Sequence, residues 1–203
     1  MTLSLNLILI AVTVAVSYLA FNQILWRDRL ILWPPAVARK RQYERMLTYG
    51  FIHADGQHLL FNMITLFFFG RPIENFIGHY MGWGGYLFFY LSAIVVAALP
   101  SYLRHKHDTH YMTLGASGAV SAVLFAFILL DPWSMILVFF IPMPALLYAV
   151  VYVGYSIYMD RAGSDNVNHS AHLWGAAYGV LFIVLMEPKA LEAFMQQLVS
   201  PSF

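Results

Sequence analysis

Ser117 stands in the tetrapeptide Gly115-Ala116-Ser117-Gly118, at the head of an apolar run that continues to Leu130. A serine in a transmembrane helix most often packs against a neighbouring helix or hydrogen-bonds to its own helix backbone. A hydroxyl becomes a nucleophile when a base takes its proton, and histidine suits this role because it titrates close to neutral pH. His172 stands near the start of another apolar run. We therefore predict that Ser117 is a nucleophile and His172 its base.

The negative charge that forms when a serine attacks a carbonyl needs hydrogen-bond donors. One candidate is the backbone N–H of Ser117, because N–H groups at a helix N-terminus are unpaired and the helix dipole is positive there. The side chains of His58 and Asn62 are two more, and their i,i+4 spacing places both on one face of a helix. Together these residues predict acyl transfer.

The positions of the acidic residues argue against two other classes of intramembrane protease. No Asp or Glu lies in the apolar runs that hold His58 and Ser117, or in the first turns of the run that holds His172. An aspartyl protease needs two carboxylates inside its spans, and a zinc protease needs H-E-x-x-H, which His58-Leu-Leu-Phe-Asn62 is not. We expect no metal and no cofactor. A small transporter or channel is disfavoured, because proton-driven transporters usually keep an acid in the core.

The composition is that of a polytopic membrane protein. Hydrophobic residues make up 61% of the 203 positions and charged residues 10%, against about 25% charged in soluble domains. The net charge of +1 gives no reason to expect nucleic acid, and the absence of cysteine excludes disulfides and thiol nucleophiles. We expect a multi-pass protein of the bacterial plasma membrane, whose partners are the lipid bilayer and other membrane proteins.

Charged residues divide the chain into six apolar runs. We expect each to be a helix, because an open strand leaves its backbone unsatisfied in lipid. The predicted fold is an all-α bundle of six transmembrane helices in a single domain (1–203), with a long first loop (about 26–55) of short amphipathic pieces. The runs are approximately 3–25, 56–70, 83–103, 115–130, 134–159 and 169–186.

The second, fourth and sixth runs should be parallel, which would bring their polar N-terminal ends to one depth. The fourth run is roughly 24 Å long at 1.5 Å per residue, against about 30 Å of hydrocarbon, so its start should lie in a recessed wet pocket. His172, Gly175 and Gly179 share one helical stripe, and Gly115 and Gly118 keep the fourth run thin. Small residues allow the close helix approach that a dyad needs.

At these residues the chain resembles the rhomboid family of intramembrane serine proteases. His58-Leu-Leu-Phe-Asn62 resembles the family's H-x-x-x-N, Gly115-Ala116-Ser117-Gly118 resembles G-x-S-G, and residues 171–179 resemble A-H-x-x-G-x-x-x-G. The resemblance implies a Ser–His dyad, with His58, Asn62 and the Ser117 amide as the oxyanion hole. It implies cleavage of transmembrane protein substrates without ATP or metal. A non-proteolytic member that binds membrane proteins is the alternative.

Further positions match the family or depart from it. His53 has a family counterpart, Arg45 occupies the arginine of the W-R loop motif, and Glu74 follows the second helix where a glutamate is common. Glu44 replaces the tryptophan of that motif, and Ser121 replaces an aromatic that in some members stacks on the catalytic histidine. The histidine should then be held differently, for instance by His169, itself at a position where small residues are common.

Two expectations concern topology and access. The family places its N-terminus in the cytoplasm and its active site outside, which puts nine Lys and Arg residues in outer loops and two inside. The positive-inside rule favours the opposite orientation. The fifth run (134–159) and the loop 160–168 are the predicted lateral gate and cap.

Overall fold

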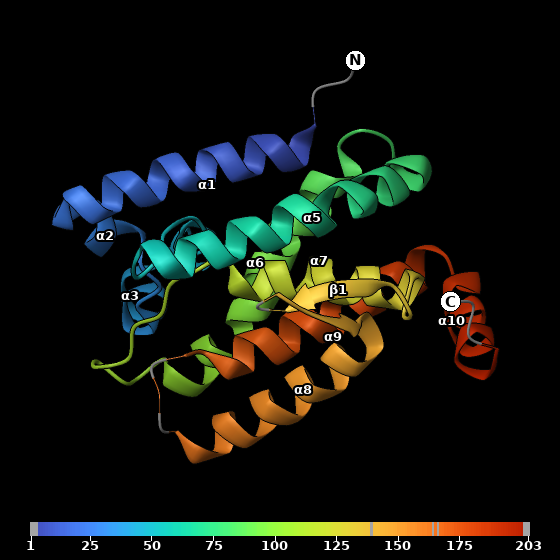
Figure 1. The fold of residues 1–203 in the computed structure, drawn as a ribbon. Helices are drawn as coiled ribbons and strands as arrows, with labels where there is room; N and C mark the ends of the chain where they lie inside the picture. Colours follow the sequence, from blue (N-terminus) through green and yellow to red (C-terminus); the bar gives the residue numbers. More distant parts are fainter. Residues whose placement is uncertain (1–3, 139, 164, 166, 201–203) are drawn as a thin grey trace.

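The computed structural model describes residues 4–138, 140–163, 165 and 167–200, and these form a helical bundle (Figure 1). Short helices fill the first loop, as the sequence predicted. The long elements are α1 (Leu5–Asn22), α5 (Gly56–Met81), α6 (Gly85–His105), α7 (Ser117–Leu130), α8 (Ala145–Ala162) and α9 (His169–Met186). The short elements are α2 (Ile24–Leu30), α3 (Pro34–Lys40), α4 (Arg45–Thr48), η1 (Tyr49–Phe51), β1 (Met135–Val138), β2 (Ile141–Pro144) and α10 (Lys189–Val199).

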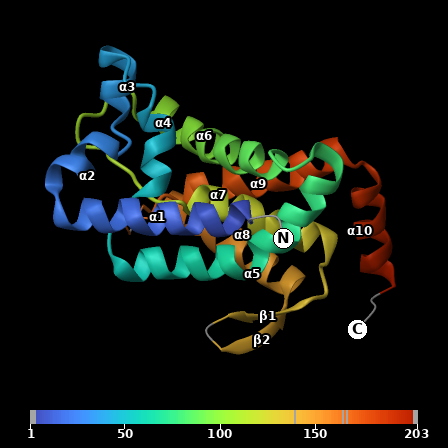
Figure 2. The same cartoon turned by 90° about the horizontal axis from the view of Figure 1, so that it is seen from above.

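Helix α7 forms the centre of the bundle. Its residues from Gly118 to Ala126 are all buried, and it packs against α5, α6 and α9. Helices α1 and α8 lie on opposite sides of this centre (Figures 1 and 2). Helices α5 and α9 run in the same direction, so their N-terminal ends lie at the same end of the bundle (Figure 1). The predicted parallel arrangement of these helices is therefore found.

Polar contacts join α1 to α5 inside the bundle. Glu74 accepts hydrogen bonds from the hydroxyl of Ser4 at 2.6 Å and the N–H of Leu5 at 2.7 Å, which satisfies donors at the start of α1. At the next residue, the side-chain amide of Asn6 donates to the carbonyl of Leu66 at 2.8 Å and accepts from the hydroxyl of Tyr86 of α6 at 2.8 Å. These contacts fix the first helix against the core.

The structure corrects two predicted elements. The run predicted to end at residue 70 continues as α5 to Met81. Pro72 lies within this helix and does not end it. Glu74 therefore lies inside α5 and not after it. The run predicted as helix from residue 134 begins as an antiparallel hairpin, β1 with β2, and helix starts only at Ala145. Pro142 and Pro144 account for this change, because proline lacks the N–H of a helix interior.

One helix was not predicted. Helix α10 follows Pro188 and is strongly amphipathic, with Leu191 and Met195 exposed. The spacing of its apolar residues was the available signal.

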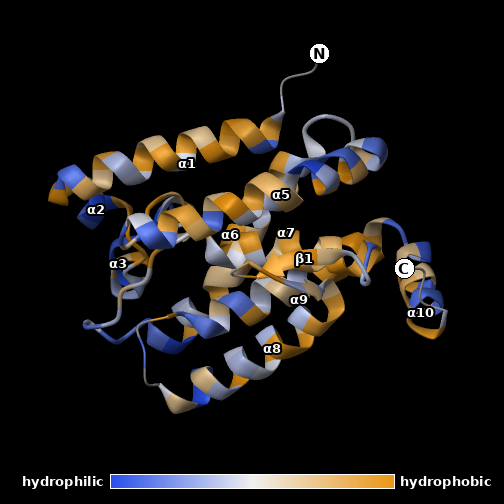
Figure 3. Cartoon of the chain, viewed as in Figure 1, coloured by the Kyte–Doolittle hydropathy of each residue, from blue (hydrophilic) through white to orange (hydrophobic). Residues whose placement is uncertain are grey.

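Three of the described helices, α1, α6 and α9, are long and apolar enough to cross a membrane. Helix α7 is apolar but has 14 residues, about 21 Å at 1.5 Å per residue. The count of six spans is therefore not confirmed by length and composition. The colouring of Figure 3 shows hydrophobic residues dominating α1 and α7, with hydrophilic residues gathered toward α2, α3 and α10. The chain is an integral, mostly helical membrane protein.

Candidate active site

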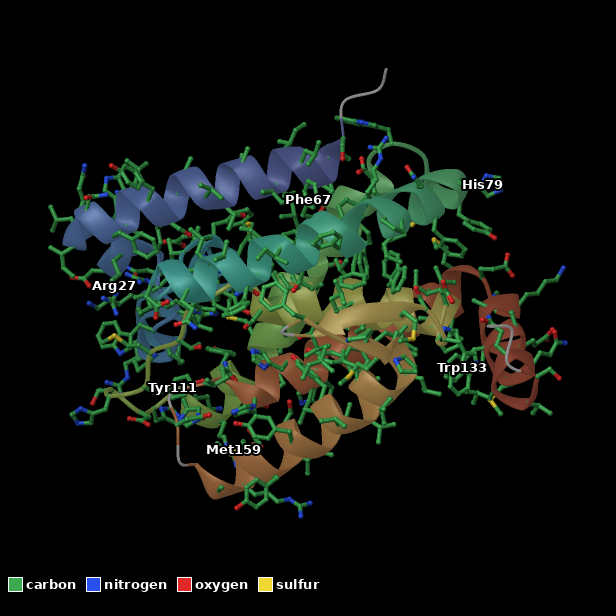
Figure 4. The ribbon with its side chains drawn as sticks, viewed as in Figure 1. Arg27, Phe67, His79, Tyr111, Trp133 and Met159 are labelled. Carbon is green, nitrogen blue, oxygen red and sulfur yellow. The ribbon has the colours of Figure 1, made fainter. Side chains whose placement is uncertain are left out.

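A cavity of about 650 Å³ opens where the N-terminal ends of α5, α7 and α9 meet. Ser117, His172, His58 and Asn62 all line it, together with residues of the first loop and of α8. Figure 4 places Arg27, which also lines the cavity, at the end of the molecule opposite to His79 and Trp133. The residues that the sequence singled out are therefore brought to one hollow at one end of the bundle.

Ser117 and His172 are joined by a hydrogen bond. Oγ of Ser117 lies 2.8 Å from Nε2 of His172, although the residues are 55 positions apart. Ser117 is the first residue of α7, and Asn168 caps α9 by accepting a hydrogen bond from the N–H of Ala171 at 3.0 Å. Both side chains therefore project from the first turns of their helices into the cavity.

The glycine stripe brings the two helices together. A Cβ on Gly175 would overlap the backbone carbonyl of Gly118, and a Cβ on Gly179 would overlap that of Ala122. Helices α7 and α9 therefore touch backbone to backbone at two places, the first of them next to the Ser117–His172 pair. The predicted close approach is found at the predicted residues.

The predicted oxyanion residues line the same cavity. Gly115 has φ +123°, which favours glycine, and a Cβ there would lie 2.7 Å from Cε1 of His58. Nδ2 of Asn62 donates to the backbone carbonyl of His58 at 2.8 Å. An amide group has two N–H donors, so a second one remains for another acceptor. The backbone N–H of Ser117 lies at the helix start, where such groups have no helical partner.

His53 holds the segment that leads into α7. Its Nε2 accepts a hydrogen bond from the N–H of Ala116 at 3.3 Å, and its Nδ1 lies 2.9 Å from Oγ of Ser17. Because Ser17 donates its proton to the carbonyl of Phe51 at 3.0 Å, Nδ1 of His53 carries the ring proton. The ring meets His58 edge-on, with 4.9 Å between centroids. Burial of His53, followed by the nearby His58, lowers the pKa of His53.

Arg45 ties the first loop together. Its guanidinium donates to the carbonyls of Asp28 and Ile31, each at 2.7 Å, and to Oε1 of Gln42 at 2.6 Å. The loop also pairs with the segment before α7, through the bridge between Leu32 and Thr113. Glu44 in place of tryptophan therefore leaves the loop docked.

Around His172, the contact with Tyr152 and the nearby acid Asp165 were not predicted, whereas the neighbour His169 was. The ring of Tyr152, from α8, lies over His172 with 6.0 Å between centroids and 26° between planes, and its hydroxyl lies 2.6 Å from Oγ of Ser121. The i,i+4 spacing of Tyr148 and Tyr152 was the only signal for this. The ring of His169 meets that of His172 edge-on, with 5.7 Å between ring centroids. Its Nε2 lies 3.1 Å from Oδ2 of Asp165, an acid that was not predicted.

Comparison with known proteins gives one consistent family. A family model described as a rhomboid domain matches residues 40–189. "RHOMBOID-like protein 12, mitochondrial" of Arabidopsis thaliana is 35% identical over 150 residues, which are 67% of this chain and 44% of that protein. "Putative rhomboid protease YdcA" of Bacillus subtilis (strain 168) is 26% identical over 170 residues, 84% of this chain and 80% of that protein. "Presenilin-associated rhomboid-like protein, mitochondrial" of Homo sapiens is 32% identical over 143 residues, 68% of this chain and 36% of that protein.

The chain spans less than half the length of the two mitochondrial relatives. Three relatives at 32–35% identity carry mitochondrial or chloroplastic names. The comparisons therefore do not support the expected bacterial plasma membrane.

Proposed function

This chain belongs to the rhomboid family, and we propose that it is an intramembrane serine endopeptidase that cleaves transmembrane segments of other membrane proteins. The observation that carries the proposal is the 2.8 Å contact between Oγ of Ser117 and Nε2 of His172 inside a cavity. Nucleophile and base need a separation of about 2.6–3.2 Å. The separation of Ser117 and His172 falls in this range, which supports the proposal.

The proposed reaction begins when Nε2 of His172 takes the hydroxyl proton of Ser117. Oγ attacks the carbonyl carbon of the scissile peptide, and the carbonyl oxygen becomes an oxyanion. The N–H of Ser117 and the side chains of His58 and Asn62 are the proposed donors to this oxyanion. His172 then gives its proton to the leaving amine, and water releases the acyl group by the reverse sequence.

The cavity suits the proposed reaction because, at about 650 Å³, it has room for water and for a segment of substrate beside Ser117 and His172. Its lining combines the dyad with apolar side chains such as Val120 and Leu124. Phe61 and Thr65 of α5 line it on one side, and Tyr148 and Tyr152 of α8 on another. We propose that the chain of a substrate enters between these two helices, with α8 as the lateral gate.

The topology is proposed with six spans in one domain, the N-terminus in the cytoplasm and the cavity outside. The docked first loop supports this orientation, because Arg45 uses its charge on carbonyls of the protein. A reporter enzyme fused after Phe203 is expected to be active in the cytoplasm. External activity would reverse the proposed orientation.

A fluorophosphonate probe tests the function, because it labels only an activated serine. We expect labelling of the purified protein in detergent, and its loss in Ser117→Ala. Ser134→Ala, which alters a serine just past the far end of α7, should label normally. If the wild-type protein is not labelled although its thermal unfolding curve shows that it is folded, the alternative of a non-proteolytic binding protein is favoured.

A further inference from the structure

The imidazole of His172 is held by few contacts for a catalytic base. In the described part of the chain, its side chain makes one hydrogen bond, to Ser117. Among the same described residues, no second polar group, such as the carboxylate of a catalytic triad, hydrogen-bonds to this imidazole. The ring of His169 meets the His172 ring edge-on, with 5.7 Å between centroids, but both histidines belong to the first turn of α9. His169 therefore cannot fix the base relative to the other helices.

Tyr152 supplies a contact from a separate helix. Its ring lies over His172 at 6.0 Å between centroids and 26° between planes, which is offset stacking. Two further aromatic rings pack on Tyr152, Phe125 of α7 at 5.5 Å and Tyr148 at 5.6 Å. The ring is thus confined on several sides.

The hydroxyl of Tyr152 is anchored to the helix of the nucleophile. It lies 2.6 Å from Oγ of Ser121, one turn after Ser117 on α7. Ser121 is buried, with 4% of its surface exposed. Tyr152 therefore contacts His172 through its ring and the helix that carries Ser117 through its hydroxyl. Because Ser121 is small, it leaves the space that the ring occupies.

We propose that Tyr152 is a positioning residue for the catalytic base, holding the His172 imidazole from α8 while Ser121 fixes the ring. The proposal rests on the proposed protease function, in which His172 takes the proton of Ser117. Helix α8 lies at the edge of the bundle and exposes Leu147, Val150 and Val151. A displacement of α8 that admits substrate would also move the ring off the base.

The first test compares four variants in detergent by the rate of fluorophosphonate labelling and by cleavage of a transmembrane substrate. A misplaced base can cost on the order of 100-fold, so Tyr152→Leu should lower the labelling rate and kcat by about 10- to 100-fold. KM should change by less than about threefold, because the ring is not proposed to bind substrate. Tyr152→Phe keeps the ring and should lose less than Tyr152→Leu, as should Ser121→Ala. Tyr158→Leu, an exposed tyrosine of the same helix, should match wild type.

The second test reads the ring of His172 directly, by NMR of protein with ¹⁵N-labelled histidine. Tyr152→Leu should shift and broaden the His172 ring signals, and Tyr158→Leu should leave them in place. If Tyr152→Leu does not fold, Tyr152→Met replaces it in both tests. Unchanged labelling and unchanged ring signals in a folded variant would overturn the proposal.

The two tests separate the two proposals. If wild type is not labelled at Ser117, the protease function fails, and the NMR comparison still decides whether Tyr152 positions His172. If wild type is labelled and Tyr152→Leu is labelled equally fast, the function stands and the role of Tyr152 fails.

Discussion

Gly175 of α9 packs on the backbone carbonyl of Gly118 of α7, with no room for a Cβ between them. Gly118 follows Ser117 directly, and Gly175 lies one turn after His172. The backbone contact therefore sets the distance between the hydroxyl and the imidazole. A side chain at either glycine would separate the helices and, with them, the Ser117 hydroxyl and the His172 imidazole.

The first prediction follows from this contact. Gly175→Ala should destabilise the protein by about 1–3 kcal/mol or more, because the new methyl group overpacks the interface between α7 and α9. It should also lower cleavage, since the dyad opens. Gly154→Ala is the matched control: it lies within α8, and a Cβ there meets nothing within 4 Å. Thermal unfolding in detergent checks the prediction, and equal midpoints for the two variants would contradict it.

The second prediction concerns the dyad. Ser117→Ala and His172→Ala should each lower cleavage of a transmembrane substrate on the order of 10³-fold or more. Each should keep the unfolding midpoint close to that of wild type, because the deleted groups face a cavity. His79→Ala, at the opposite end of the bundle (Figure 4), should retain full activity. Full activity in either dyad variant would refute the assignment.

The third prediction concerns the oxyanion. Asn62→Ala should lower kcat by about 10- to 1000-fold, as loss of one donor does in other acyl-transfer sites. Asn22→Ala is a close control, because Nδ2 of Asn22 also donates to the carbonyl four residues earlier, at 2.7 Å, but on an exposed surface. A steady-state assay of both variants decides this. His58→Ala should resemble Asn62→Ala; if both retain the wild-type rate, these residues are structural only.

The fourth prediction is a pH dependence. The pKa of His53 is lowered from 6.5, with burial as the main cause, His58 adding to it and Asp55 opposing it. The folded protein therefore keeps His53 neutral, whereas the unfolded chain takes up a proton as pH falls through 6.5. Stability present at higher pH is thus lost progressively below pH 6.5.

His53→Asn tests this dependence. Between about pH 7.5 and pH 5, the unfolding midpoint of wild type should fall more than that of His53→Asn. The exposed His79→Asn variant should follow wild type. Parallel curves for wild type and His53→Asn would exclude a contribution from His53.

Some of the site could be predicted because its signals are local. The glycines that thin α7 and α9 are spaced by the helical repeat, so they identify a contact face without a structure. His58 and Asn62 share a face for the same reason. The sixth run was predicted with the ends that α9 has, since Asn168 precedes it as a cap and Glu187 ends the apolar run.

Other contacts could not be predicted because they join distant segments. His53 connects Ser17 to Ala116, and nothing in the local pattern of these residues indicates a partner. Tyr152 was one of several tyrosines in an apolar run. Which of them faces the base depends on the rotation and depth of α8 against α9, and those follow from packing.

The sequence by itself determined the candidate residues: a serine at a helix start, a histidine on a glycine stripe, and apolar runs that hold no acid near these residues. These are properties of residue type and of the 3.6-residue helical period. The tertiary structure alone decided that Ser117 and His172 meet at 2.8 Å, and that the aromatic ring over the base comes from α8. The reason is physical: helix–helix packing, set by side-chain volumes over the whole bundle, fixes contacts between residues that no local period relates.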